Sequence, residues 1–119
     1  MNILIVDDSR TIRKLLSDTL EAVGHTVCQA EDGIDALDAL EKFSPEIIIT
    51  DLNMPRMDGL ELVKKLRHIN TTKFIPILFL TTEGSSEMKE KGRQAGATGW
   101  LLKPFDRSRL LNTIERVSS

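Results

Sequence analysis

Short runs of aliphatic residues alternate along the chain with stretches in which apolar residues recur at helical spacing. Four of the runs are uniformly apolar and occupy residues 3–6, 47–49, 77–80 and 100–102. Such runs are typical of strands that are covered on both faces. Residues 26–30 form a fifth run in which polar and apolar residues mix, which favours a half-exposed strand at a sheet edge.

Between these runs, apolar residues recur at every third or fourth position, the spacing of an amphipathic helix. The positions that predict the first, second, third and fifth helices are Ile12, Leu15, Leu16, Leu20, Val23, Ile34, Leu37, Leu40, Leu60, Val63, Leu66, Leu110, Leu111, Ile114 and Val117. Gly24 is expected to end the first helix, and Asp106 is expected to cap the last one.

A fourth helix is expected over residues 85–94, but its pattern is weaker. Its one large apolar anchor is Met88. Gly92 lies inside the helix at a cost of about 1 kcal/mol relative to alanine. We therefore expect this helix to be the most loosely held, either as an ordinary exposed helix or as a movable element.

Strands and helices thus alternate strictly, which predicts an α/β protein. In such proteins a parallel sheet carries helices on both faces, and right-handed crossovers join the strands. The 119 residues fit one domain, 1–119, with no internal repeat, no linker and no room for a separate output domain.

The composition makes the core aliphatic and the net charge small. The chain has 11 Ile, 16 Leu and 5 Val against 4 Phe, 1 Trp and no Tyr. A net charge of −2 without a basic block argues against nucleic acid as a partner. A single cysteine, Cys28, excludes an internal disulfide and fits a reducing compartment. With no leader pattern and no apolar run of membrane-spanning length, we expect a cytoplasmic monomer without membrane association.

Polar side chains follow four of the five predicted strands, at the end where parallel strands bind ligands. Asp7 and Asp8 follow the first strand, Asp51 the third, Thr81 the fourth and Lys103 the fifth. Taken singly, each is an ordinary cap, turn or surface residue. Taken together at one rim of the sheet, they predict a binding site.

The residue types at this rim suit phosphoryl chemistry. Three carboxylates repel one another and favour a bound cation. Oxygen ligands without histidine or cysteine favour Mg²⁺ or Ca²⁺, and an open site suits Mg²⁺, which keeps waters and recruits phosphate oxygens. Lys103 and Thr81 offer an ammonium and a hydroxyl to a phosphoryl group. Asp51, at the end of a wholly aliphatic strand, is the candidate nucleophile and would form an aspartyl phosphate.

In order and spacing, these residues resemble the receiver domains of response regulators. The matching motifs are Asp7-Asp8, Asp51-Leu52-Asn53-Met54-Pro55-Arg56-Met57-Asp58-Gly59, Thr81, and Lys103-Pro104-Phe105. The resemblance covers residues 1–119 and is greatest to the stand-alone regulators of chemotaxis. It implies a doubly wound, flavodoxin-like (βα)5 fold with a five-stranded parallel sheet in the order 2-1-3-4-5.

The same resemblance implies roles for the acidic residues. Asp51 accepts a phosphoryl group from a phosphohistidine on a sensor histidine kinase. The side chains of Asp8 and Asp51 bind Mg²⁺, together with the backbone carbonyl of Asn53, and Asp7 acts through water.

The resemblance also implies how the signal spreads and ends. Lys103 and Thr81 hold the phosphoryl oxygens, Thr81 shifts toward them, and Trp100 follows it inward as the aromatic switch residue. Asn53 and Glu83 lie beside the path of the attacking water, so we expect relatively fast self-dephosphorylation.

Two residues depart from the family pattern. Trp100 stands where Tyr or Phe is usual, and its larger indole needs a partner for its N–H when buried, which weighs against its full inward rotation. Thr82 stands where a small Ala is common, and its bulk would narrow the path by which water or the phosphodonor reaches Asp51.

The implied partners are a histidine kinase of the chemotaxis type, a downstream target such as a flagellar motor switch protein, and a phosphatase. The target is expected to bind the face formed by the fourth helix, the fifth strand and the fifth helix. The protein is then a signalling switch that assists its own phosphorylation and dephosphorylation, rather than an enzyme.

Three other functions stay open at this stage. A phosphorelay shuttle or phosphate sink would use the same residues. An aspartate-nucleophile phosphatase would need a second carboxylate two positions after the nucleophile, where this chain has Asn53. A flavin or nucleotide binder would need a Gly-rich loop after the first strand, where Asp7-Asp8-Ser9-Arg10 stands instead.

Overall fold

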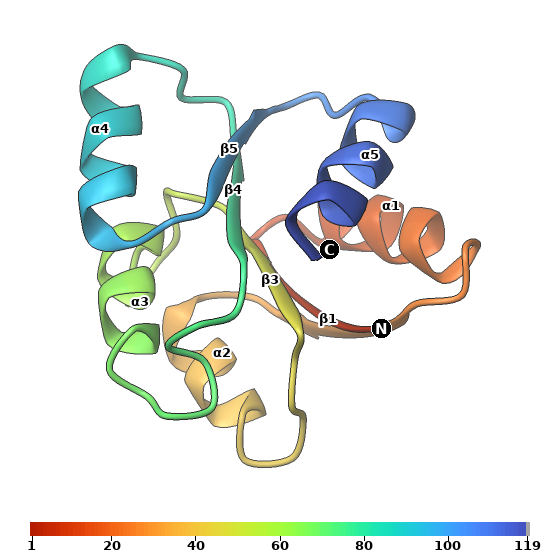
Figure 1. The fold of residues 1–119 in the computed structure, drawn as a ribbon, viewed down its shortest axis with the longest axis horizontal. Helices are drawn as coiled ribbons and strands as arrows, with labels where there is room; N and C mark the ends of the chain where they lie inside the picture. The colour runs from red at the N-terminus through yellow and green to blue at the C-terminus, as the bar shows by residue number, and fades with distance from the viewer. Residues whose placement is uncertain (119) are drawn as a thin grey trace.

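The computed structural model describes residues 1–118 and contains a parallel five-stranded sheet in the order β2-β1-β3-β4-β5 (Figure 1). The strands are β1 (Asn2–Val6), β2 (Thr26–Ala30), β3 (Ile47–Thr50), β4 (Ile77–Thr81) and β5 (Gly99–Leu102). The helices are α1 (Arg10–Glu21), α2 (Gly33–Ala39), α3 (Gly59–Leu66), α4 (Ser86–Ala95) and α5 (Arg107–Ser118). The expected α/β architecture and its strand order are confirmed.

The helices cover the sheet in two layers. In Figure 1, α1 and α5 lie on one side of the sheet, and α2, α3 and α4 lie on the other. Alternate residues of β1 serve the two layers, because Ile3 and Ile5 pack with α1 and α5, whereas Leu4 and Val6 pack with the other three helices. All four side chains are almost fully buried, as a continuous apolar run predicts.

β2 lies at an edge of the sheet, as its mixed composition predicts, and Thr26 and Gln29 are exposed. Cys28 on this strand is only partly buried. The reason is that β2 has a neighbouring strand, β1, on one side alone. Among the described residues, no helix combines the length and apolar character that crossing a bilayer requires.

α4 is better anchored than its sequence suggests. It begins one residue later than expected, because Ser85 is its N-cap and accepts a hydrogen bond from the Met88 N–H. A Cβ on Gly92 would lie 2.7 Å from Cζ3 of Trp100, so this glycine makes room for the indole ring. The ring also packs on Phe79, with the ring centroids 5.0 Å apart. Met88 is therefore not the only anchor of the helix.

Candidate functional site

The strand register brings the expected side chains to one rim of the sheet. The ends of β1 and β3 meet there, because the Asp51 N–H donates to the Val6 carbonyl at 2.8 Å. The ends of β4 and β5 meet in the same way, since the Lys103 N–H donates to the Thr81 carbonyl at 2.9 Å. The residues that follow the strands therefore emerge together.

Three carboxylates and an ammonium form the centre of the rim. Oxygen atoms of Asp7, Asp8 and Asp51 lie within 4.8 Å of one another. Asp7 is 2% exposed and Asp51 is 8% exposed, whereas Asp8 faces solvent. The Nζ atom of Lys103 lies 2.7 Å from Asp7 Oδ2 and 2.9 Å from Asp51 Oδ2. The expected acidic cluster and its lysine are thus in direct contact.

Burial and charge compete within this cluster. Burial raises the pKa of Asp7, and hydrogen bonds from Lys103 and from the Ser9 N–H offset this only in part. Burial by itself lowers the pKa of Lys103, but hydrogen bonds and charges from Asp7 and Asp51 outweigh it and raise that pKa. The ammonium is therefore charged at neutral pH, whereas ionised Asp7 is held at a cost.

Backbone groups orient the two buried carboxylates. Asp51 Oδ1 accepts a hydrogen bond from the Leu52 N–H at 2.7 Å, which leaves Oδ2 for Lys103. Asp7 Oδ1 accepts from the Ser9 N–H at 2.8 Å, which leaves its Oδ2 for the same lysine. Each carboxylate is thus held by a backbone N–H at Oδ1, with its Oδ2 directed at the Nζ atom of Lys103.

The loop after β3 closes tightly around Asp51. A Cβ on Gly59 would overlap the Asp51 carbonyl oxygen, so glycine is required there. The Gly59 N–H donates to the Leu52 carbonyl at 2.8 Å, and the Asp58 side chain caps α3 by accepting from the Glu61 N–H. These contacts give the segment from residue 51 to residue 59 its short, closed form.

The donor set fits a hard divalent cation. It offers carboxylate oxygens, which suit Mg²⁺ better than they suit a softer metal. In the part of the chain that the structure describes, the ammonium of Lys103 pairs with two of the three carboxylates, those of Asp7 and Asp51, so negative charge is left to attract a cation. Asp8, exposed beside the two buried acids, gives the cluster access to solvent. Asn53 is also exposed, on the loop between β3 and α3.

The loop after β4 connects Thr81 to Trp100. The buried Thr81 hydroxyl accepts a hydrogen bond from the Glu83 N–H at 3.3 Å. The Glu83 carbonyl accepts from the indole Nε1–H of Trp100 at 2.8 Å, which supplies a polar partner for this partly buried side chain. Thr81, Glu83 and Trp100 therefore form one hydrogen-bonded chain from the rim toward α4.

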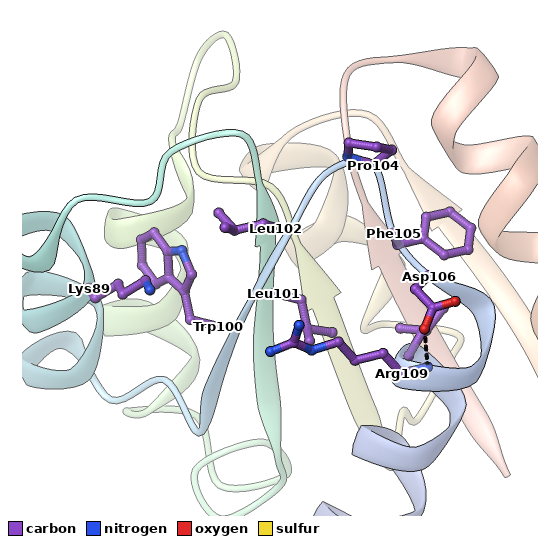
Figure 2. Close-up of a pocket in the computed structure, with 9 residues that line it drawn as sticks. Lys89, Trp100, Leu101, Leu102, Pro104, Phe105, Asp106 and Arg109 are labelled. Atoms are coloured by element: carbon purple, nitrogen blue, oxygen red, sulfur yellow. Dashed lines mark hydrogen bonds between the residues drawn. The ribbon is translucent and has the colours of Figure 1, made fainter.

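A pocket of about 190 Å³ lies on the face formed by α4, β5 and α5 (Figure 2). In Figure 2, Lys89 and Trp100 lie on its α4 side, and Phe105 and Arg109 lie on its α5 side. Leu102 on β5 also lines the pocket and is 48% exposed. The pocket thus combines apolar surface with basic side chains at its border.

Sequence patterns gave no signal for one contact beside the rim. The guanidinium of Arg56 pairs with the carboxylate of Asp32 at 2.7 Å and so joins the loop after β3 to the turn after β2. The two residues are 24 positions apart, and no periodicity relates them. The nearest hint in the sequence is Pro55, a residue type that favours a turn.

Comparison with known proteins identifies the family. Residues 3–115 match the response regulator receiver domain. Chemotaxis protein CheY1 of Helicobacter pylori is 40% identical over 119 residues, which cover 98% of this chain and 96% of that protein. The CheY homologue of Campylobacter jejuni is 41% identical over 119 residues, which cover 98% of this chain and 92% of that protein.

Solved structures agree with the sequence comparisons. CheY4 of Vibrio cholerae is 49% identical and has a TM-score of 0.93, with 98% of this chain and 97% of that chain covered. The receiver domain of a sensor histidine kinase from Pseudomonas aeruginosa is 28% identical, has a TM-score of 0.90 over 98% of this chain and 96% of that chain, and holds a magnesium ion coordinated in its active-site cleft. This chain therefore belongs to the response regulator receiver domain family, and within it resembles the CheY-type chemotaxis regulators of two-component signalling, which act through phosphorylation of an aspartate.

Proposed function

We propose that residues 1–119 act as a single receiver domain that accepts a phosphoryl group on Asp51 from a phosphohistidine of a sensor histidine kinase. The observation that carries this proposal is the position of Lys103, 2.9 Å from Asp51 and 2.7 Å from Asp7. An ammonium so placed can neutralise an oxygen of a phosphoryl group attached at Asp51.

The transfer is a displacement at phosphorus. A carboxylate oxygen of Asp51 attacks the phosphorus atom while the P–N bond to the imidazole breaks. The electron pair of that bond goes to the imidazole nitrogen, which leaves as neutral histidine when its other nitrogen carries a proton. Lys103 exchanges its contact with Asp51 for one with a phosphoryl oxygen. The Thr81 hydroxyl turns from the Glu83 N–H to donate to a second oxygen.

Mg²⁺ is the cofactor that this donor set fits. We assign its ligands to the side chains of Asp8 and Asp51 and the backbone carbonyl of Asn53, with Asp7 acting through water. When bound, Mg²⁺ neutralises charge on the transferring phosphoryl oxygens. Support comes from the carboxylate oxygens within 4.8 Å of one another and from the magnesium ion in the Pseudomonas receiver domain.

The phosphoryl group is removed by water, and two polar side chains orient that water. Asn53 is exposed two residues after Asp51. The Glu83 carboxylate accepts a hydrogen bond from the Ser85 N–H at 3.2 Å, and it leaves this contact to act on the water. The chain is therefore a signalling switch that resets itself, rather than an enzyme with an external substrate.

The output leaves through the face formed by α4, β5 and α5. The hydrogen-bonded path from Thr81 through Glu83 to Trp100 ends beside the pocket on that face. We assign this face to a downstream target of the flagellar motor switch type and to a phosphatase. Leu102 and Trp100 supply apolar contact area there.

The test of the phosphorylation site is the variant Asp51→Asn, treated with acetyl phosphate in the presence of Mg²⁺. An amide is a poor nucleophile, so we expect labelling to be lost, as it should be when Mg²⁺ is removed from the parent. Asp58→Asn is the matched control, because it alters an exposed carboxylate of the same loop and keeps an acceptor for the α3 cap. Undiminished labelling of Asp51→Asn would contradict the assignment.

A further inference from the structure

Arg56 and Asp32 join two loops beside the acidic rim. The contact has two points, with Nε of Arg56 2.7 Å from Oδ2 of Asp32 and Nη2 2.9 Å from Oδ1. Arg56 belongs to the loop between β3 and α3, which also carries Asn53, and Asp32 belongs to the turn between β2 and α2. An ion pair with two parallel hydrogen bonds of this kind is both strong and directional.

Asp32 is a buried charge that depends on this contact. Its residue is 2% exposed, and its Oδ1 also accepts a hydrogen bond from the Asp35 N–H at 2.9 Å, which caps α2. The hydrogen bond from Arg56 holds the pKa of Asp32 below its usual range. Because a buried charge without a partner is costly, Asp32 keeps Arg56 in place.

The backbone at Arg56 is strained, which indicates that the contact is maintained against a cost. The φ angle of Arg56 is 63°, in the left-handed region that favours glycine. The neighbouring Met57 secures the same junction, since its carbonyl accepts from the Gly33 N–H at 3.2 Å. A Cβ on Gly33 would lie 2.6 Å from Met57 Cγ, so the two loops are in close contact.

We propose that Arg56 is a positioning residue, which by pairing with Asp32 holds the loop of residues 52–58 in the form that presents the Asn53 carbonyl for Mg²⁺. This inference rests on the metal site proposed above. The two ends of the loop are already joined, because the Gly59 N–H donates to the Leu52 carbonyl at 2.8 Å. A loop that is held at its ends and also at Arg56 loses less conformational entropy when a cation binds.

The variant Arg56→Gly distinguishes positioning of the loop from two simpler roles of Arg56, which are an effect on folding stability and an effect of its charge on cation binding. Glycine relieves the positive φ, which offsets part of the stability that is lost when Asp32 loses its ion pair. Removal of a positive charge near an acidic cluster strengthens the binding of a divalent cation by electrostatics alone. Loss of positioning weakens that binding, so charge and positioning predict opposite signs.

The experiment measures the Mg²⁺ affinity of the full chain by isothermal titration calorimetry. We expect Arg56→Gly to bind Mg²⁺ at least about threefold more weakly, less than the roughly 10–100-fold loss seen when a direct support of a ligand is removed. Asp32→Asn keeps an acceptor for the α2 cap but lacks the charge, so it should weaken binding similarly. Arg56→Lys keeps the charge without the two-point geometry and should lie between. Lys42→Gln, at an exposed cation after α2, is the control for charge and should not weaken binding.

A second measurement needs no metal. In Mg²⁺-free buffer, the amides of Gly33, Met57 and Gly59, which donate hydrogen bonds within the loop and at its junction, should exchange hydrogen faster in Arg56→Gly than in the parent. Equal or tighter Mg²⁺ binding by Arg56→Gly, with unchanged exchange at these amides, would overturn the inference. If Asp51→Asn binds Mg²⁺ as tightly as the parent, the proposed metal site itself is wrong, which is a distinct result.

Discussion

Single residues at the rim are arranged for charge rather than for stability. Asp7 is almost fully buried, and burial raises its pKa in spite of the hydrogen bond from Lys103. An acid with a raised pKa in the folded state holds its proton more tightly there than in the unfolded state. Its ionised form therefore lowers the free energy of unfolding at pH values above that raised pKa. The chain thus keeps a carboxylate where burial makes its ionisation less favourable than in water.

We expect Asp7→Asn to raise the free energy of unfolding at neutral pH without Mg²⁺, by at most about 1.4 kcal/mol for each unit by which the pKa is raised. The amide oxygen can still accept from the Ser9 N–H. The gain should shrink as pH falls through the raised pKa of Asp7, because the parent then takes up a proton. Urea unfolding at several pH values measures this, with the exposed cap variant Asp106→Asn as control. A gain independent of pH would contradict the explanation.

Among the elements, α4 and β5 are in contact where the indole of Trp100 packs against Gly92. In an exposed helix, Gly to Ala stabilises by about 1 kcal/mol. Here the added methyl group would meet Trp100, so we expect Gly92→Ala to destabilise the protein by about 1–3 kcal/mol. In a Trp100→Ala background the same change should stabilise it by about 1 kcal/mol. A double-mutant cycle by urea unfolding checks this reversal, and the same sign in both backgrounds would show that the ring does not set the cost.

The elements were predictable where one local pattern decides the environment of a residue. Residues 3–6 and 77–80 are uniformly apolar and are buried on both faces of the sheet. Gly92 looked like a weakness because helical spacing describes one helix at a time. Its partner, Trp100, comes from the next strand, so the contact exists only once the sheet and α4 have packed together.

The candidate site likewise contains some contacts that the sequence predicts and others that it does not. Asp7, Asp51 and Lys103 could be placed together from the sequence, because the ends of parallel strands share a rim. The indole N–H was expected to need a partner, but its acceptor is the backbone carbonyl of Glu83, which any residue type would supply. The pairing of Arg56 likewise depends on how two loops meet, and no pattern along the chain encodes that meeting.

On the scale of the whole molecule, the rim and the pocketed face share two segments. β5 brings Trp100 to the pocket and ends at Leu102, next to Lys103 of the rim. The loop after β4 gives Thr81 to the rim and, at Glu83, the acceptor for the indole. The contacts proposed above from Thr81 and Lys103 to a phosphoryl group would therefore act on the groups that shape the pocket.

We expect a target to bind the α4–β5–α5 face more tightly when the rim carries beryllium fluoride with Mg²⁺ as a phosphoryl mimic. A coupling of about 1–3 kcal/mol corresponds to roughly 5–150-fold in affinity. The measurement is calorimetric titration with a flagellar motor switch protein from the same organism, with and without the mimic. Linkage requires the target to tighten binding of the mimic by the same factor, which the fluorescence of Trp100, the one tryptophan, can follow.

Two variants locate the effect on the surface. Trp100→Ala should lose the affinity difference between the two states, because it removes the indole that connects the Glu83 carbonyl with the pocket. Leu15→Ala, at an exposed side chain of α1, which is not part of the α4–β5–α5 face, should keep that difference. Equal affinity in both states would favour the phosphorelay shuttle or phosphate sink, since such a protein passes on or discharges its phosphoryl group without a face that a target must read.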